Sequence, residues 1–369
     1  MRNPIHCNAI SLSVVAAFGF FVSAVAGAAT LSAESRLNSG PVLVAQNTPK
    51  ASKVVRRSVR FMQLGESFAW LPFQVARGGN CYAKEGLDIN WIPGPVNAAQ
   101  AVLALMTNQA DISAIGTNAV LSAIDARRPV VAFGVGAKGE TQVLVLRNEV
   151  MANIKAKLSV TPSSPIRDRV QALKGLNVAA NTAGGTVMLA LQSALSEFGV
   201  DFKSGQVQLQ AIDGPAAMYA AMRQRRIDGF IFSPPAPLQA IVDNEGAVWI
   251  SGGDGDVKSW AGTYASVYAT TSRYATDNPE VLKIVIDCAQ QASTLIKTNP
   301  ASAMAMARPF YPQTQDETYR LSFEATRGVF IDGPHSSAKG FQATLDKYNA
   351  TLSAPIQVTH KRAFEAEPR

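Results

Sequence analysis

The sequence has few of the side chains that most often carry out catalysis or hold metal ions. Its 369 residues include three histidines and three cysteines. His6 and Cys7 lie at the extreme N-terminus, and the remaining histidines, His335 and His360, do not have metal-ligand spacing. The Gly-x-Ser-x-Gly elbow of serine hydrolases is also absent. The sequence therefore predicts no catalytic residue, no metal site and no cofactor.

Charged residues are sparse as well, at 17% of the chain, with a formal net charge of +7. One tight basic cluster occurs, formed by Arg223, Arg225 and Arg226, and we interpret it as a solvated helix end. Because no basic stripe is interleaved with aromatic residues, we expect no nucleic-acid partner. The positive field would weakly favour the approach of an anionic ligand.

One glycine-rich segment, residues 134–139, has the spacing of a dinucleotide-binding fingerprint. That fingerprint must open a helix whose N-terminus holds the pyrophosphate. Residues 141–146 follow it here, and their apolar, extended pattern is typical of a strand. We therefore reject dinucleotide binding and interpret the segment as the approach to a hinge.

No apolar run is long enough for a membrane-spanning helix, and the N-terminus instead resembles a secretory signal peptide. Arg2 precedes an uncharged run over residues 9–26, which ends in small residues. Its strongly apolar part is about a dozen residues, fewer than the roughly 20 that span a bilayer. Cys7 precedes the run, so it is not a lipoprotein cysteine. We predict a signal peptide over 1–28, a disordered leader over 29–57 and a periplasmic product.

The mature chain would retain two cysteines, Cys81 and Cys288. Two are too few for a disulfide framework or a thiolate metal site. One disulfide in an oxidising compartment is an alternative. We expect instead two buried thiols, each on a helix.

The rest of the chain alternates strand-like and helix-like segments. A first series has predicted strands at 59–64, 87–91, 111–114 and 130–133, separated by helices at 69–84, 95–106 and 118–126. A second series has strands at 176–179, 207–211 and 229–232, each followed by a helix, at 185–198, 214–224 and 235–243. Helices at 278–298, 315–323 and 337–348 follow, and residues 151–165, with two prolines, are expected to form a mobile surface excursion.

Extended segments at 141–146 and 264–270 bracket the second series and predict a two-segment hinge. The alternating order predicts an α/β fold with two doubly wound, mostly parallel sheets. We assign residues 58–140 and 263–350 to lobe 1, residues 141–262 to lobe 2, and residues 351–369 to a C-terminal tail.

Ligands of open parallel sheets bind beyond the carboxyl ends of the strands, so the residues that follow each strand are the candidate site. The loop at 181–186 is the most informative, because Gly184 and Gly185 let the backbone approach a ligand while the next helix offers free N–H groups. An ordinary N-cap by Thr182 or Thr186 explains the pattern equally well. The full candidate set is Glu66, Ser67, Phe68, Trp70, Gly116, Thr117, Asn118, Thr182, Gly184, Gly185, Thr186, Asp213 and Ser233.

Several of these candidates have a structural explanation as well. Phe68 and Trp70 would most often be core residues, with stacking on a ligand as the alternative. Glu66 would bind an ammonium or hydroxyl group, or cap the first helix. Asp213 precedes Gly214 and suits a turn better than a catalytic base.

Residues 59–348 resemble the periplasmic substrate-binding proteins of ABC importers. The similarity is to the branch with nitrate, taurine and aliphatic-sulfonate binders and thiamine-pyrimidine-precursor binders. It rests on YAKEGLDI at 82–89, NQADI at 108–112, LKGLNVA at 173–179 and QRRIDGF at 224–230. The resemblance implies a type II-like two-lobed fold, a monomer, and hinge closure over a small molecule that is delivered to a membrane permease. It also implies binding roles for Ser67, Thr117, Asn118, Thr182, Gly185 and Thr186.

From the helix-opening loop we predict that the ligand is a small organic anion, such as a sulfonate, a taurine-like molecule or a carboxylate. A neutral pyrimidine or aromatic ligand is an alternative. A second alternative is an enzyme on the same fold, for pyrimidine synthesis or desulfination. Such enzymes resemble this fold but rely on cysteine or histidine in the cleft, and the predicted loops contain neither.

Overall fold

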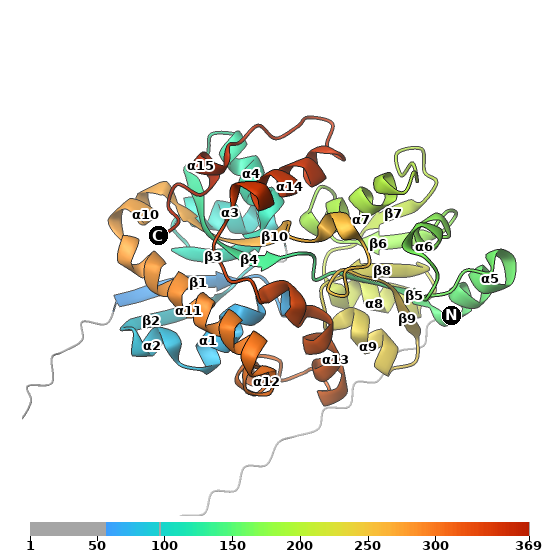
Figure 1. Ribbon diagram of the computed structural model, residues 1–369, viewed down its shortest axis with the longest axis horizontal. Helices are drawn as coiled ribbons and strands as arrows, with labels where there is room; N and C mark the ends of the chain where they lie inside the picture. The colour runs from blue at the N-terminus through green and yellow to red at the C-terminus, as the bar shows by residue number, and fades with distance from the viewer. Residues whose placement is uncertain (1–56, 96, 369) are drawn as a thin grey trace, which may run out of the picture. The chain divides into compact units, whose positions relative to one another are not determined.

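The computed structural model describes residues 57–95 and 97–368, which form two five-stranded sheets covered by helices (Figure 1). The predicted signal peptide and nearly all of the predicted leader lie outside these residues. Arg57, the last residue assigned to the leader, begins the first strand. No helix in the described part of the chain is long and apolar enough to span a membrane.

The first sheet has the strand order β2-β1-β3-β10-β4. Its strands are β1 (Arg57–Gln63), β2 (Leu87–Pro93), β3 (Ile112–Gly116), β4 (Val130–Lys138) and β10 (Tyr264–Thr271). β1 pairs in parallel with β2 and β3, whereas β10 is antiparallel to β3 and β4. We call this sheet and its helices lobe 1.

The second sheet, with its helices called lobe 2, repeats the pattern in the order β7-β6-β8-β5-β9. Its strands are β5 (Val143–Arg147), β6 (Asn177–Ala180), β7 (Gln208–Ala211), β8 (Gly229–Phe232) and β9 (Gly246–Ser251). β5 is antiparallel to β8 and β9. Each sheet is therefore mixed, and the antiparallel strand in each is the one that enters from the other lobe. The predicted two-lobed α/β fold is confirmed, with β9 a strand that the sequence pattern did not predict.

The predicted helix at 69–84 is broken into η1 (Phe68–Trp70), α1 (Leu71–Gly78) and α2 (Cys81–Lys84). Asn80 adopts a left-handed conformation with φ of 56°, which ends the helical run before Cys81. Cys81 is joined by a disulfide to Cys288 of α11 (Pro279–Thr298). The expectation of two free buried thiols was therefore wrong. Geometry decides this, because the turn between α1 and α2 brings Cys81 against α11.

The surface excursion predicted at 151–165 is helical for about half of its length, which the sequence pattern did not predict. α5 (Asn148–Leu158) is a regular helix that ends at Ser159, with φ of 56°. Glu149 in its first turn and Lys155 and Lys157 in its last turn complement the helix dipole. The two prolines lie beyond this C-cap, so they do not interrupt the helix.

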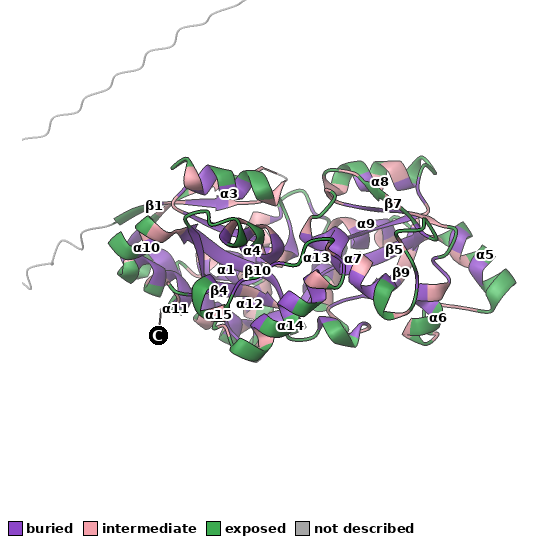
Figure 2. Ribbon diagram, turned by 90° about the horizontal axis from the view of Figure 1, so that it is seen from above, coloured by how far each residue is buried: buried purple, intermediate pink, exposed green. Residues whose placement is uncertain are grey.

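The remaining helices cover the two sheets, with their exposed residues on the outer side (Figure 2). Lobe 2 has α6 (Ile166–Gln171), α7 (Thr186–Glu197), α8 (Pro215–Arg223) and α9 (Ala236–Val242). The others are α3 (Ala98–Met106), α4 (Thr117–Asp125), α10 (Ser272–Asp277), α12 (Pro300–Ala307), α13 (Asp316–Thr326), α14 (Ala338–Asn349) and α15 (His360–Ala363), with 3-10 turns η2 (Lys258–Trp260), η3 (Arg308–Phe310) and η4 (Arg327–Phe330). Beyond α14, Ile356, Val358 and Phe364 are buried in one cluster with Phe341.

The chain crosses between the sheets directly from β4 to β5 and returns between β9 and β10. The two crossings touch, since the backbone N–H of Gly139 donates to the carbonyl oxygen of Thr263 at 2.6 Å. No helix opens after residues 134–139, whose first five residues belong to β4. Dinucleotide binding at that segment is thereby excluded, as the sequence indicated.

Candidate functional site

A cavity of about 530 Å³ lies between the carboxyl ends of the strands of both lobes. This volume falls within the usual range for small-molecule sites. Ten of the thirteen predicted site residues line it: Glu66, Ser67, Trp70, Gly116, Asn118, Thr182, Gly184, Gly185, Thr186 and Ser233.

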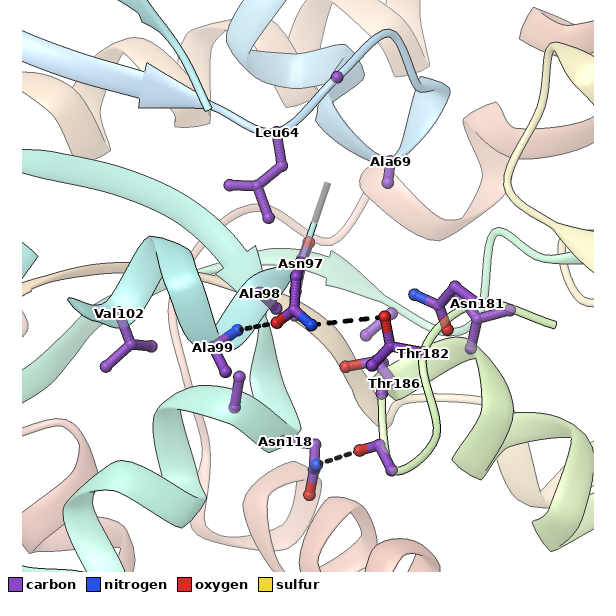
Figure 3. A pocket seen from close by; sticks show the side chains of 18 of the residues that line it. Leu64, Ala69, Asn97, Ala98, Ala99, Val102, Asn118, Asn181, Thr182 and Thr186 are labelled. Atoms are coloured by element: carbon purple, nitrogen blue, oxygen red, sulfur yellow. Dashed lines mark hydrogen bonds between the residues drawn. The ribbon is translucent and has the colours of Figure 1, made fainter. Parts of the chain in front are cut away.

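The loop before α7 contacts lobe 1 at two points (Figure 3). Asn118 Nδ2 donates to the carbonyl oxygen of Gly184 at 2.8 Å. Asn97 Nδ2 lies 3.5 Å from Thr182 Oγ1, which in turn donates to Asp213 Oδ1 at 2.6 Å. The loop is therefore held at the gap between the lobes.

Neither threonine of this loop caps α7. Gly185 is the N-cap residue, and no side chain accepts a hydrogen bond from the first turn. The ordinary N-cap interpretation is therefore excluded. The first turn of a helix has N–H groups without intrahelical partners and a partial positive charge, which together favour an anion.

α4 begins directly opposite, at Gly116, also without a side-chain cap. A methyl group added at Gly116 would collide with Oγ1 of Thr186, so only glycine permits this approach of the two lobes. Two uncapped helix N-termini, one from each lobe, thus meet at the same cavity.

Five buried polar atoms in the cavity wall lack a hydrogen-bond partner within the described residues: Asn118 Oδ1, Asn181 Oδ1, Thr186 Oγ1, Ser233 Oγ and Ser266 Oγ. Ser233 is 4% exposed and Ser266 2% exposed. Buried polar atoms are nearly always paired, and leaving one unpaired costs about 1–3 kcal/mol. A polar ligand group in the cavity would satisfy them.

The first loop of lobe 1 forms another part of the wall. Glu66 is exposed, and its Oε1 accepts a hydrogen bond from Thr314 Oγ1 at 2.7 Å. Ser67 caps η1, since its Oγ accepts from the backbone N–H of Ala69 at 3.1 Å. Trp70 is held in the wall by Nε1, which donates to the carbonyl oxygen of Leu64 at 2.9 Å.

Three predicted site residues do not line the cavity. Phe68 is fully buried and stacks on Tyr311 with ring centroids 4.4 Å apart, so it is a core residue. Thr117 is also fully buried, close to the hydroxyl of Tyr348, where burial raises the pKa of that tyrosine well above its usual value. Asp213 is exposed and acts on the site through Thr182 alone.

The charge of the cavity wall is low, because Glu66 and Arg128 are its charged lining residues among those described. Arg128 follows the C-terminal end of α4, so an anion at the helix N-termini would be held by N–H groups, hydroxyl groups and amides. Within residues 57–95 and 97–368, no group of three His, Cys, Asp or Glu side chains could hold a metal ion.

Sequence reasoning missed Asn97, Gln142 and Ser266, which also line the cavity. Asn97 follows β2 and caps α3 by accepting from the backbone N–H of Ala99 at 2.8 Å. Reading the residues after that strand, as was done for its neighbours, would have found it. Gln142 and Ser266 lie on the crossing segments, whose position next to the site depends on the antiparallel entry of β5 and β10.

Solved structures with the same fold are periplasmic binding proteins. The aliphatic sulphonate-binding protein of Escherichia coli superimposes with a TM-score of 0.60 at 18% identity, covering 79% of this chain and 90% of that one. The alkanesulfonate-binding protein of Xanthomonas axonopodis pv. citri, bound to MOPS, gives 0.60 at 16% identity, with coverages of 78% and 90%. The nitrate-binding protein of Synechocystis gives 0.56 at 14% identity, with coverages of 78% and 75%. These identities establish the fold alone.

A comparison with curated protein sequences gives no match. A family model does match, over residues 67–309, and its description is the NMT1-like family. The matched region begins at the first cavity loop and includes both crossings between the sheets. The expected similarity to periplasmic substrate-binding proteins is confirmed, and because the match covers more than half of the chain, this protein belongs to the NMT1-like family.

Proposed function

We propose that the protein is the solute-binding component of an ABC importer, exported through a signal peptide at residues 1–28, and that it captures a small organic anion between its lobes. Sulfonates, taurine-like molecules and carboxylates are the candidate ligands. The observation that carries the proposal is the meeting of two uncapped helix N-termini, at Gly116 and Gly185, at one cavity. Names of the similar structures, which include sulfonate and nitrate binders, support it.

The anion would sit against the first turns of α4 and α7. Ser233 Oγ and Ser266 Oγ, which lack partners among the described residues, would donate to its oxygens. An organic anion suits the cavity better than nitrate, because about 530 Å³ greatly exceeds what a four-atom ion fills and because most lining side chains are apolar. Glu66 would accept a hydrogen bond from an ammonium or hydroxyl group on the same ligand.

Binding without turnover is the function we favour over an enzyme. Neither cysteine nor histidine is among the described residues that line the cavity. Cys81, the cysteine that an enzyme on this fold could use as a nucleophile, forms a disulfide with Cys288 in lobe 1. A thiolate is the reactive form of cysteine, and a disulfide removes it.

The proposal is tested by thermal shift and isothermal titration calorimetry with butanesulfonate, taurine, butyrate and neutral pyrimidines. An anion at 100 times its Kd would stabilise the protein by about 2.7 kcal/mol, which is readily measured. Stabilisation by pyrimidines alone would contradict the proposal and favour the neutral-ligand alternative.

A pair of serine variants in lobe 2 separates binding from stability. Ser233→Ala removes a hydroxyl without a protein partner, so we expect weaker anion binding and little change in Tm. Ser193→Ala should do the reverse. Its Oγ accepts from Trp260 Nε1 at 3.1 Å inside the lobe 2 core, and losing it leaves a buried donor unpaired at a cost of about 1–3 kcal/mol.

A further inference from the structure

The cavity does not end at the helix N-termini but continues as an arm between α3 and α4. α3 lines this arm with Val102, Leu103 and Met106, and α4 lines it with Ala119, Ser122 and Ala123, followed by the C-cap residue Ala126. Met106 lies three and four residues after Leu103 and Val102, and the α4 residues are separated mainly by three or four, which places each set on one side of its helix. Two helix faces therefore border the arm, and it opens into the site described above.

The two helix faces carry side chains of different size, which leaves space between them for a ligand. The α4 side carries small side chains, which are alanines and Ser122, whereas the α3 side carries the large side chains. Leu103 is 53% exposed, one of the two large hydrophobic side chains that stand out in this way among the described residues. An apolar side chain next to a row of small residues forms an open apolar trough. Binding of a ligand that removed this apolar surface from water would be favoured by the hydrophobic effect.

The direction of the arm follows from the fold. α3 begins at Asn97 and α4 at Gly116, and both residues are at the cleft, where Asn97 and Asn118 reach the α7 loop (Figure 3). Both helices then run back over the same face of the first sheet and share one core cluster. Nine residues of α4 rise about 14 Å, so the arm leads well away from the helix N-termini.

The other end of the cavity carries the polar groups. Ser233 Oγ and Ser266 Oγ, 4% and 2% exposed as residues, lie in its wall without a hydrogen-bond partner in the described part of the chain and can donate to an anion. One continuous cavity thus has polar groups without a hydrogen-bond partner at one end and an apolar trough at the other. A ligand that matches both ends is amphiphilic.

We propose that the arm between α3 and α4 binds an unbranched alkyl tail, so that the preferred ligands are organic anions with a medium-length aliphatic chain. This inference rests on the proposed function, because the head group is the anion bound at the first turns of α4 and α7. Affinity should then increase by about fourfold for each added methylene that the arm fully buries, until the arm is filled.

The test is calorimetry of the full chain with methanesulfonate, butanesulfonate and octanesulfonate. For the unmodified protein we expect affinity to rise in that order. Ala123→Phe fills the arm, so butanesulfonate affinity is expected to stay within twofold while octanesulfonate affinity falls at least tenfold. Leu103→Ser, on the exposed side of α3, should reduce the gain per methylene without blocking the arm.

A matched control adds the same bulk outside the arm. Gln100 is an exposed residue of α3 that does not line the cavity, so Gln100→Phe should leave the whole series unchanged. Equal affinity for all three sulfonates in the unmodified protein would overturn the inference and leave the proposed function intact. So would an equal loss for all three in Ala123→Phe. No binding of any sulfonate or carboxylate would instead overturn the proposed function.

Discussion

At the scale of single residues, the site depends on how closely the two lobes approach at Gly116. The backbone there has φ of −58° and ψ of 129°, a conformation that any residue adopts. A glycine is therefore favoured here because a side chain would collide with its neighbour, and not because the backbone conformation requires one. The atom that fills the space is Oγ1 of Thr186, on the opposite lobe.

Gly116→Ala is expected to weaken binding of every ligand while leaving the Tm of the free protein nearly unchanged. The added methyl group collides with Thr186 only when the lobes meet, and overpacking of this kind costs about 1–3 kcal/mol. A loss of about fivefold in affinity follows from the low end of that range. Calorimetry with butanesulfonate measures it.

A double-mutant cycle identifies the cause of that loss. Thr186→Ala removes the colliding oxygen, so the penalty of Gly116→Ala should shrink in that background. If the penalty were the same in both backgrounds, the collision would not be its origin.

At the scale of elements, α14 holds the two crossings together. Lys347 of α14 forms a buried ion pair with Glu140 on the outgoing crossing, with the two side chains 3% and 0% exposed. Its Nζ also donates to Thr263 Oγ1, on the returning crossing, at 3.1 Å. One ammonium group thus bridges both segments of the hinge.

Lys347→Met is expected to lower the free energy of unfolding by about 3–5 kcal/mol, because it leaves the Glu140 carboxylate buried without its cation. Replacing both partners, in Lys347→Met/Glu140→Leu, should recover much of this loss. Urea denaturation measures both. The control is Lys283→Met, which breaks an ion pair with Asp287 whose side chains are 57% and 49% exposed and should cost at most about 0.5 kcal/mol. Similar losses for the two lysines would contradict the bridging role of Lys347.

Elements also show how far sequence reasoning extends. Helices and strands with strong periodicity were predicted to within a few residues, and the two crossing segments were recognised by their position in the order of elements. α5 was missed because Pro162 and Pro165 were taken to exclude a helix from the whole segment. Both prolines lie beyond the helix end at Ser159. The break at Asn80 was missed although Gly78, Gly79 and Asn80 are residue types that commonly end a helix.

The candidate site was predicted where position in the chain determines position in space. Loops after parallel strands gather at one edge, so Ser67, Asn118 and the residues around Gly185 were found. The arm between α3 and α4 was not predictable, because Val102, Leu103 and Met106 have the spacing of an ordinary core-facing stripe. Whether such a stripe faces a core or a trough depends on the size of the side chains opposite, which only the fold reveals.

At the scale of the whole molecule, the proposed function makes binding depend on the balance between open and closed arrangements of the lobes. Contacts between the lobes outside the cavity contribute to that balance. The backbone N–H of Phe68 donates to the carbonyl oxygen of Pro234 at 2.9 Å. Thr318 of α13 donates from Oγ1 to Gln239 Oε1 of α9 at 2.9 Å. A ligand that binds only the closed arrangement has an apparent affinity proportional to the closed fraction.

Thr318→Val should therefore weaken binding of all alkanesulfonates by the same factor. A hydrogen bond of this kind contributes about 1 kcal/mol, which corresponds to roughly a fivefold change in the closed-to-open ratio. Ser322→Ala is the matched control on α13, because its hydroxyl donates to the carbonyl oxygen of Thr318 within the same helix and does not reach lobe 2. It should leave affinity unchanged. Calorimetry distinguishes this global effect from the local one, since Ala123→Phe in the arm penalises long chains alone. A chain-length-dependent loss in Thr318→Val would contradict the view that the contact between α13 and α9 acts through lobe closure.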